Sequence, residues 1–268
     1  AFDLRDKAVL KLERNSADGI ELIGNSTRLQ FSKTGATWRI VEPIAARADY
    51  AAVEGLITRL SSTHMQRIVA PDTSDLRGYG LDGPVMTATV VGGGSSASLL
   101  IGDEDAGERF ARDAGRPEVF AVEESLLTDL SKDVSEYRRK DIFDARSFTA
   151  TRIETGRGDE TLTLERNSAD GDATWRDASG QDVDVTVVDD LFTKLSGLRA
   201  QAFEESAGTT GEAPALSVTI RYDGDKTETV TFVRSAIDVF ATRSDEPGSA
   251  RIDAMLFDEA LMAVDALR

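Results

Sequence analysis

Side chains that commonly carry chemistry are scarce in this chain of 268 residues. It contains no cysteine, which excludes a disulfide, a thiolate nucleophile and a Cys-ligated metal site. His64 is the only histidine, so a zinc site that needs two or three imidazoles is excluded as well. As a general base, His64 would need a nucleophile and an orienting carboxylate, and no Gly-x-Ser-x-Gly motif is present. We expect His64 to lie on the surface or to face a helix end.

Carboxylates are the abundant reactive group. Asp and Glu together number 48 against 31 Lys and Arg, a net charge of -17. Acidic clusters occur at residues 103–105, at Asp182 with Asp184, and at residues 189–190. They could surround a calcium ion, but none has the spacing of a calcium loop. A glycosidase that uses two carboxylates stays open, although nothing selects a particular pair. We favour a solvated acidic face, and assign no catalytic residue, no metal site and no cofactor.

One glycine run has the appearance of a phosphate-binding loop. Gly92-Gly93-Gly94 would need to be followed by Gly-Lys-Ser/Thr at the start of a helix. Instead, Ser95-Ser96 leads into the apolar residues 99–101, which are typical of a strand. The run therefore predicts the turn of a hairpin.

Charge and hydropathy narrow the class of protein further. With 40% hydrophobic residues the chain has the composition of a soluble globular protein. Its acidic surface repels phosphate backbones, so we expect no nucleic-acid partner. No apolar run of about 18 residues is present that could span a bilayer. The chain begins at Ala1 without a signal peptide, and we expect an export signal or anchor outside it.

Short motifs recur in the same order in both halves of the chain. Residues 37–39 match 174–176, which contain the only two tryptophans, and residues 56–62 match 191–197. The offset drifts by a few residues, as loop insertions in a duplicated domain would produce. We expect a first repeat over residues 1–140 and a more divergent second repeat over 141–268. Residues 12–19 also recur letter for letter as 164–171, out of register with every other match and without a physical reason.

Each half predicts one order of elements. In the first half we expect strands over residues 9–13, 20–23, 29–32 and 37–41, a helix from the N-cap Asp49 to about Ser62, hairpins over 87–101 and 109–122, and a helix over 123–137. In the second half we expect a helix over 185–198 with Asp184 as N-cap, strands over 216–222, 227–233, 239–242 and 250–252, and a helix over 255–267. Strand runs that end in single helices favour an α+β fold, a tandem duplicated domain with mainly antiparallel sheets and two packed helices each.

The two tryptophans could be exposed binding residues or buried core residues. An exposed Trp38 in a strand could stack on a sugar ring or a partner protein. Its equivalence to Trp175 favours a core residue that both repeats require.

Several segments together have the character of a family signature. Residues 38–43 (Trp-Arg-Ile-Val-Glu-Pro) precede the helix that Asp49 caps, and residues 79–84 read Tyr-Gly-Leu-Asp-Gly-Pro. Residues 100–102 (Leu-Ile-Gly) are followed by 110–112 (Phe-Ala-Arg), and charged segments lie at 5–7 and 139–141. These segments resemble the bacterial family called domain of unknown function 4340, closely over residues 1 to about 145 and more loosely beyond. The residues that carry the resemblance, which we expect to be structural, are Trp38, Pro43, Asp49, Tyr79, Gly80, Leu81, Pro84, Gly102 and Trp175.

The resemblance implies a cellular context but no catalytic residue. Members have an N-terminal membrane anchor and an extracytoplasmic portion, and are auxiliary components beside ABC transporters of the gliding-motility type. We therefore expect a non-enzymatic, periplasmic or cell-envelope module, anchored through a segment absent from this chain, that binds envelope proteins or ABC transporter membrane subunits. The alternative is a hydrolase, carbohydrate-active or metal-dependent, that uses acidic residues. A third hypothesis is a small-molecule binding protein.

Overall fold

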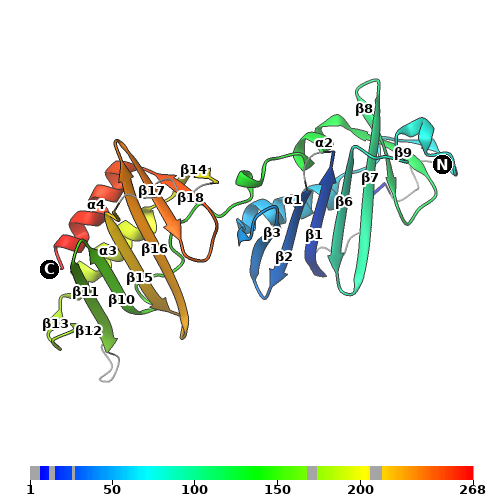
Figure 1. Cartoon of the computed structure of the whole chain (residues 1–268). Helices are drawn as coiled ribbons and strands as arrows, with labels where there is room; N and C mark the ends of the chain where they lie inside the picture. The colour runs from blue at the N-terminus through cyan, green and yellow to red at the C-terminus, as the bar shows by residue number, and fades with distance from the viewer. Residues whose placement is uncertain (1–6, 12–15, 26–27, 168–173, 206–212, 268) are drawn as a thin grey trace. The chain divides into compact units, whose positions relative to one another are not determined.

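The computed structural model describes residues 7–11, 16–25, 28–167, 174–205 and 213–267. The chain divides into two compact units, Ala1–Arg139 (unit 1) and Lys140–Arg268 (unit 2). Figure 1 shows each unit as a twisted sheet with helices packed against it. None of the described helices combines the length and the apolar character that crossing a bilayer requires.

Unit 1 is built on a nine-stranded sheet in the order β4-β3-β2-β1-β6-β7-β8-β9-β5. Two four-stranded meanders join where β1 pairs with β6, and β5 completes one edge beside β9; all of these pairs are antiparallel. The strand bounds are β1 (Ala17–Gly24), β2 (Arg28–Thr34), β3 (Thr37–Glu42), β4 (Ala46–Arg47), β5 (Arg67–Ala70), β6 (Met86–Gly92), β7 (Ser95–Asp105), β8 (Glu108–Asp113) and β9 (Val119–Glu123).

Unit 2 repeats this topology strand for strand, in the order β13-β12-β11-β10-β15-β16-β17-β18-β14. Its strand bounds are β10 (Ala150–Arg157), β11 (Glu160–Asn167), β12 (Thr174–Asp177), β13 (Asp182–Val183), β14 (Ala200–Glu204), β15 (Leu216–Tyr222), β16 (Lys226–Ser235), β17 (Asp238–Arg243) and β18 (Ser249–Ile252). The expected α+β fold of two similar, mainly antiparallel domains is confirmed.

The pairing register shows which residues are equivalent in the two units. Ile20 of β1 lies between Phe31 of β2 and Val90 of β6. In unit 2, Ile153 lies between Leu164 and Ile220 in the same way. Because side chains on paired positions point to the same face, this register fixes the core face of both sheets.

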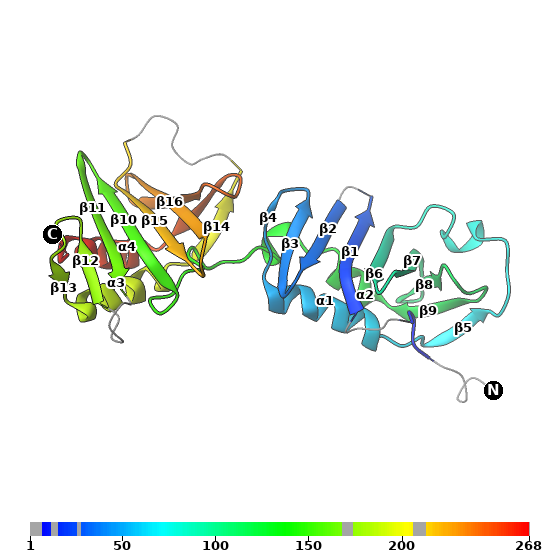
Figure 2. The same ribbon diagram turned by 90° about the horizontal axis from the view of Figure 1, so that it is seen from below.

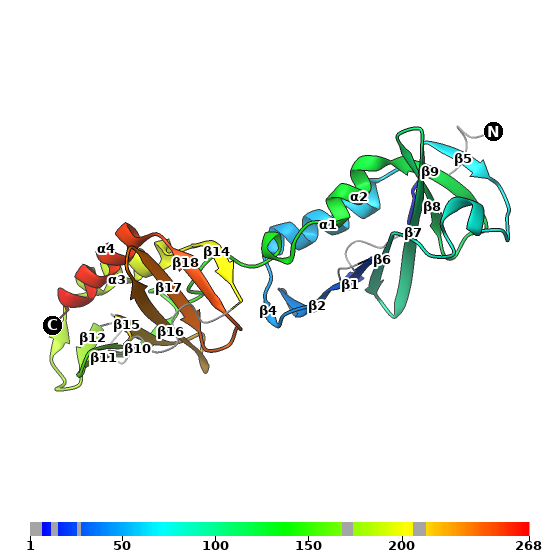
Figure 3. The same ribbon diagram turned by 45° about the horizontal axis from the view of Figure 1, so that its top comes forward.

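Four helices pack against these core faces. Their bounds are α1 (Tyr50–Ser62), α2 (Glu124–Leu130), α3 (Val185–Gly197) and α4 (Ala254–Asp265), with short 3-10 helices η3 (Arg77–Tyr79) and η4 (Val134–Glu136). Asp49 caps α1 by accepting a hydrogen bond from the backbone N of Ala52 at 2.8 Å, and Asp184 and Asp253 cap α3 and α4 similarly. In each unit both helices lie on one face of the sheet (Figures 2 and 3).

The apolar stripes predicted for two helices are buried. The buried residues of α1 are Val53, Leu56, Ile57 and Leu60, and those of α3 are Val188, Leu191, Phe192 and Leu195. Each unit has its own hydrophobic core cluster, which contains one of the two tryptophans.

Two expected elements are wrong in part. Val9 and Leu10 are buried but form bends instead of a strand, since the carbonyl of Val9 accepts from the Arg116 guanidinium and its N–H donates to Thr63 O. The remainder of that expected strand, residues 12–13, lies outside the described residues. The helix expected over 123–137 ends at Leu130. Asp133 then accepts from the backbone N of Ser135 at 2.8 Å and starts η4, which shows how a short polar side chain competes with helix continuation.

The identical segments at 12–19 and 164–171 lie partly outside the described residues. Where they are described, Ala17–Gly19 belongs to β1 whereas 164–167 belongs to β11, the equivalent of β2. Identical letters therefore occupy different positions of the fold.

Candidate functional site

Family-signature residues from three distant segments meet on β7 and β8. Gly102 of β7 is buried, and a Cβ atom there would lie 2.1 Å from the carbonyl O of Tyr79. The Tyr79 ring packs edge-on against Phe110 of β8, with centroids 5.1 Å apart. Gly80 has a φ of +65°, and a Cβ there would meet the Asp103 carboxylate at 2.5 Å. Gly102 is therefore required by a close backbone contact, and Gly80 by its positive φ beside the Asp103 carboxylate.

The segment that contains this signature covers part of the sheet face opposite the helices. Leu81, 2% exposed, follows η3, while Pro84 precedes β6. Unit 2 has Val233 at the register position of Gly102, because Ile101 and Phe232 are equivalent partners of Ala111 and Ala241. The close backbone approach at Gly102 thus belongs to unit 1. Residues 206–212, where unit 2 would carry its counterpart, lie outside the described residues.

A second group of signature residues joins β3 to α1. Trp38 is 1% exposed, and its Nε1 donates to Oε1 of Glu54 at 2.9 Å. Lys33 donates to the same oxygen at 2.9 Å. Burial raises the pKa of Glu54, but the hydrogen bonds from Trp38 and Lys33 outweigh it, so this pKa lies below its ordinary value. The backbone N of Asp49 donates to Tyr137 O at 2.7 Å, which ties the start of α1 to the end of the unit.

Of the remaining signature residues, Pro43 is exposed and Trp175 is buried. Pro43 follows β3 after a cis peptide bond with Glu42. Trp175 is 2% exposed and packs against Phe192 of α3, with ring centroids 6.1 Å apart. Both tryptophans are core residues, so neither forms a stacking surface.

The acidic clusters have local partners. Glu104 accepts from the backbone N of Gly107, and Asp105 pairs with Arg67. Asp182 pairs with Arg176 at 2.8 Å, while Asp184 caps α3. Among the described residues, no three potential ligands gather as a metal site would require.

His64 and the glycine run have structural positions. His64 is exposed and forms an isolated bridge with Ala8, as Arg199 does with Asp141 in unit 2. Gly93 and Gly94, with φ of +59° and +77°, form the turn between β6 and β7, where Gly92 pairs with Ser95. The predicted hairpin is present there, and no helix follows the glycines.

The sheet face away from the helices carries a row of polar side chains that occurs in both units. In unit 1 the register aligns Gln30, Glu21, Thr89 and Ser98 across β2, β1, β6 and β7. In unit 2 it aligns Thr163, Glu154, Thr219 and Thr229 at the equivalent positions. We call these two sets the polar rows.

Each polar row is held by the same kind of contacts. The hydroxyls of Thr89 and Ser98 lie 2.9 Å apart, and those of Thr219 and Thr229 lie 3.0 Å apart. The glutamate of each row pairs with an arginine: Glu21 with Arg28 at 2.7 Å, and Glu154 with Arg152 at 3.2 Å. The two arginines occupy different positions in their units. The polar row therefore recurs, although the ion pair of its glutamate is formed with a different partner position.

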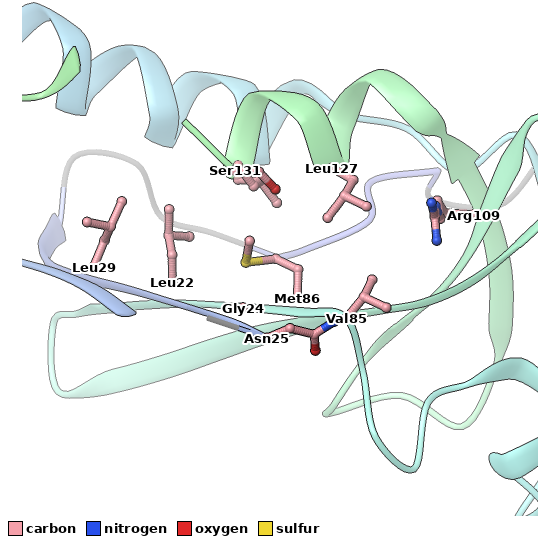
Figure 4. A pocket seen from close by; sticks show the side chains of 10 residues that line it. Leu22, Gly24, Asn25, Leu29, Val85, Met86, Arg109, Leu127 and Ser131 are labelled. Carbon is pink, nitrogen blue, oxygen red and sulfur yellow. The ribbon is translucent and has the colours of Figure 1, made fainter. Parts of the chain in front are cut away.

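Unit 1 also contains a pocket of about 440 Å³ between α2 and the sheet (Figure 4). Leu22, Leu29 and Met86 line its sheet side, and Leu127 of α2 and Ser131, the residue after α2, face them. The other lining residues are Gly24, Asn25, Val85, Arg109 and Leu130.

The polar end of this pocket contains a complete ion pair. Arg109 donates from Nε and Nη2 to the two carboxylate oxygens of Glu124, at 2.6 and 3.1 Å, and from Nη1 to Gly102 O. Hydrogen bonding to Glu124 raises the pKa of Arg109, so the guanidinium stays charged and paired.

Sequence reasoning did not identify the polar rows or the pocket. The rows left a signal, since hydroxyl residues alternate with apolar ones at 87–90 and again at 217–220. The pocket left none, because its lining comes from five segments that only folding brings together.

The fold and these surfaces define a duplicated α+β protein, with a polar row in each repeat and a pocket in the first. The family model described as "Domain of unknown function (DUF4340)" matches residues 38–219, which is more than half of the chain, and the chain belongs to that family. The match starts in β3 of unit 1 and ends in β15 of unit 2. No curated protein and no solved structure matches the chain.

Proposed function

We propose that this chain is a non-enzymatic binding module of an ABC-type transporter or envelope machine of the gliding-motility kind, located outside the cytoplasm and anchored in the membrane. Its partners are envelope proteins or membrane subunits of that transporter. The two repeats act as tandem copies of one binding unit.

The observation that carries the binding role is the recurrence of the polar row. Thr89 and Thr219 are identical residues at equivalent positions of the two sheets, as are Glu21 and Glu154. A duplicated surface suits a partner that offers two similar contacts, since linked sites raise the apparent affinity without new contacts. A reaction centre, by contrast, needs only one copy of its groups.

The ionisation of the carboxylates supports binding over hydrolysis. An acid-base hydrolase needs a carboxyl group that remains protonated near neutral pH. The carboxyl groups of Glu54, Glu123, Asp133, Asp177 and Asp184 have pKa values shifted downward, because hydrogen bonds from neighbouring groups favour the ionised form. Asp177 and Glu123 are examples, held by Ser179 and Arg59 respectively.

Crosslinking in the cells that naturally produce the chain tests this proposal. A photoreactive amino acid at Thr89 or Thr219 should capture a membrane subunit of a transporter. The matched control places it at Ser62, which is exposed at the end of α1 on the helical side. Capture of no envelope or transporter protein, or equal capture from Ser62, would contradict the proposal.

A further inference from the structure

The pocket of unit 1 exists because the two repeats end differently. α2 has 7 residues and ends at Leu130, whereas α4 has 12 residues and ends at Asp265. Where α4 continues to Asp265, unit 1 has the non-helical residues 131–133 followed by the short η4. At the end of β1 lies Gly24, where β10 ends in Arg157. Arg157 forms an ion pair with Asp265, which closes the end of unit 2.

The side chains between helix and sheet are also smaller in unit 1 than in unit 2. Leu127 and Phe257 are each the fourth residue of their helices. Phe257 is fully buried and packs against Phe232 at a centroid distance of 5.1 Å. Phe232 corresponds to Ile101 in unit 1. Two smaller side chains thus replace two aromatic rings in unit 1, and one of them, Leu127, lines the pocket.

At the corresponding end of unit 2 there is an open depression lined by Arg157, Glu160 and Asp265. Its lining is charged and includes the ion pair described above, whereas six of the ten residues that line the pocket of unit 1 have apolar side chains and one, Arg109, is charged. The two ends have therefore diverged in chemistry as well as in shape.

We propose that the pocket of unit 1 binds an uncharged amphiphile, a small molecule with an apolar body and a neutral hydrogen-bonding head. Leu22, Leu29 and Met86 would contact the apolar body. Concave sites with an apolar wall and a few polar groups are the usual form of small-molecule sites. The head would lie near Asn25, toward the end of the pocket that contains Arg109 (Figure 4).

The ion pair at the polar end decides the charge of the ligand. Arg109 and Glu124 neutralise each other through two hydrogen bonds. A charged head would find no opposite charge without breaking that pair, and it would lose its own hydration. This inference concerns a ligand, goes beyond the transporter role and does not depend on it.

The four methionines provide a direct test by NMR of the full chain labelled with [13C-methyl]methionine. 1-Nonanol should shift the signal of Met86 with saturation. Met255 and Met262, which are 72% and 68% exposed, report adsorption to exposed apolar surface and should stay unchanged. Nonanoate, with the same chain and a charged head, should bind at least about tenfold more weakly.

Leu127→Phe introduces the ring that unit 2 carries and should weaken 1-nonanol binding at least about tenfold. Thr128→Phe places the same ring on the neighbouring exposed residue and should leave the affinity unchanged. Ser131→Trp narrows the pocket from an exposed residue, so it keeps the test independent of core packing. The signal of Met65, which is buried in the same core, verifies that each variant is folded.

No saturable shift of Met86 would overturn the proposal. The same holds if Met255 or Met262 shifts with the same concentration dependence, if nonanoate binds as tightly as the alcohol, or if the folded Leu127→Phe and Ser131→Trp variants bind like the unchanged chain.

Discussion

Gly102 and Gly80 allow the family signature to pack against the sheet of unit 1. A Cβ at Gly102 would lie 2.1 Å from Tyr79 O and 3.1 Å from Leu81 Cδ2. The first of these neighbours is backbone, which cannot rotate away as a side chain can. Packing therefore explains why glycine occupies both positions of the signature.

We expect Gly102→Ala to lower the free energy of unfolding of unit 1 by about 1–3 kcal/mol, because the added methyl group overpacks the contact with Tyr79. Gly55→Ala is the control, since a Cβ there would meet no atom within 4 Å apart from the neighbouring backbone of α1, and alanine favours a helix by up to about 1 kcal/mol. Urea unfolding followed by Trp38 fluorescence, with Trp175→Phe in the background, measures both. Equal effects of the two substitutions would contradict the packing argument.

Tyr137 makes unit 1 sensitive to alkaline pH. Burial raises its pKa to about 12 from the ordinary 10.0. Above pH 10 the unfolded chain loses the phenolic proton while the folded chain keeps it, so stability falls as pH rises from about 10 to about 12. The expected loss is about 2–3 kcal/mol.

Comparison of Tyr137→Phe with the unchanged chain measures this loss. The variant should lose less stability between about pH 9 and about pH 12 in urea unfolding followed by Trp38 fluorescence. If stability falls equally with pH in both proteins, the pKa of Tyr137 is the same in the folded and unfolded states, and the prediction is wrong.

At the scale of elements, each repeat begins with a segment that an arginine holds in place. Nη2 of Arg116 donates to Val9 O at 2.8 Å, and Nη1 of Arg243 donates to Ile142 O at 2.7 Å. Val9 and Ile142 are equivalent, since each follows the residue that forms the isolated bridge. Arg116 lies in the turn between β8 and β9, whereas Arg243 is the last residue of β17. The repeats therefore conserve the contact while changing the residue that makes it.

In unit 2 this contact depends on a buried ion pair. Arg243 and Glu228 are 7% and 2% exposed, and Glu228 also accepts hydrogen bonds from the backbone N of Asp144 and Ala145 at 2.9 and 2.8 Å. Since Asp245 also pairs with Arg243, removal of Glu228 would leave the guanidinium partly paired but both backbone N–H groups without this acceptor.

We expect Glu228→Ala to lower the free energy of unfolding of unit 2 by about 3 kcal/mol or more. Glu165→Ala removes an exposed ion pair with Arg152 and should cost less than about 1 kcal/mol. Trp175 fluorescence in a Trp38→Phe background follows the unfolding of unit 2. A small effect of Glu228→Ala, similar to that of Glu165→Ala, would mean that the buried pair contributes little.

At the scale of the whole molecule, two hydrophobic cores account for the stability. The core cluster of unit 1 ends at Tyr137, and that of unit 2 begins at Ile142. Because each core contains one tryptophan, the two units can be observed separately in the same chain.

We expect the two units to unfold as separate cooperative transitions. Gly102→Ala should shift the Trp38 transition alone, and Glu228→Ala should shift the Trp175 transition alone, since mutations in separate cores with no shared partner act independently. The two fluorescence-detected urea transitions measure this directly. A shift of both transitions by either substitution would show that the units fold as one cooperative body.

The sequence by itself determined the local elements and the duplication. Asp49 and Asp184 predicted helix starts through their capping side chains, and the apolar spacing of α1 predicted its buried face, because these signals act within one or two turns. The glycine run predicted its turn for the same reason. Where two local signals competed, as at Asp133, the prediction extended the helix too far.

Only the tertiary structure decided which distant residues meet. Gly102 acquires its role from Tyr79, and Arg243 from Ile142, through contacts that no sequence spacing encodes. The pocket of unit 1 arises from the difference in length between α2 and α4 and from the small residue Gly24. It is visible only in three dimensions, because space left unfilled is a property of packed elements and leaves no pattern in the chain.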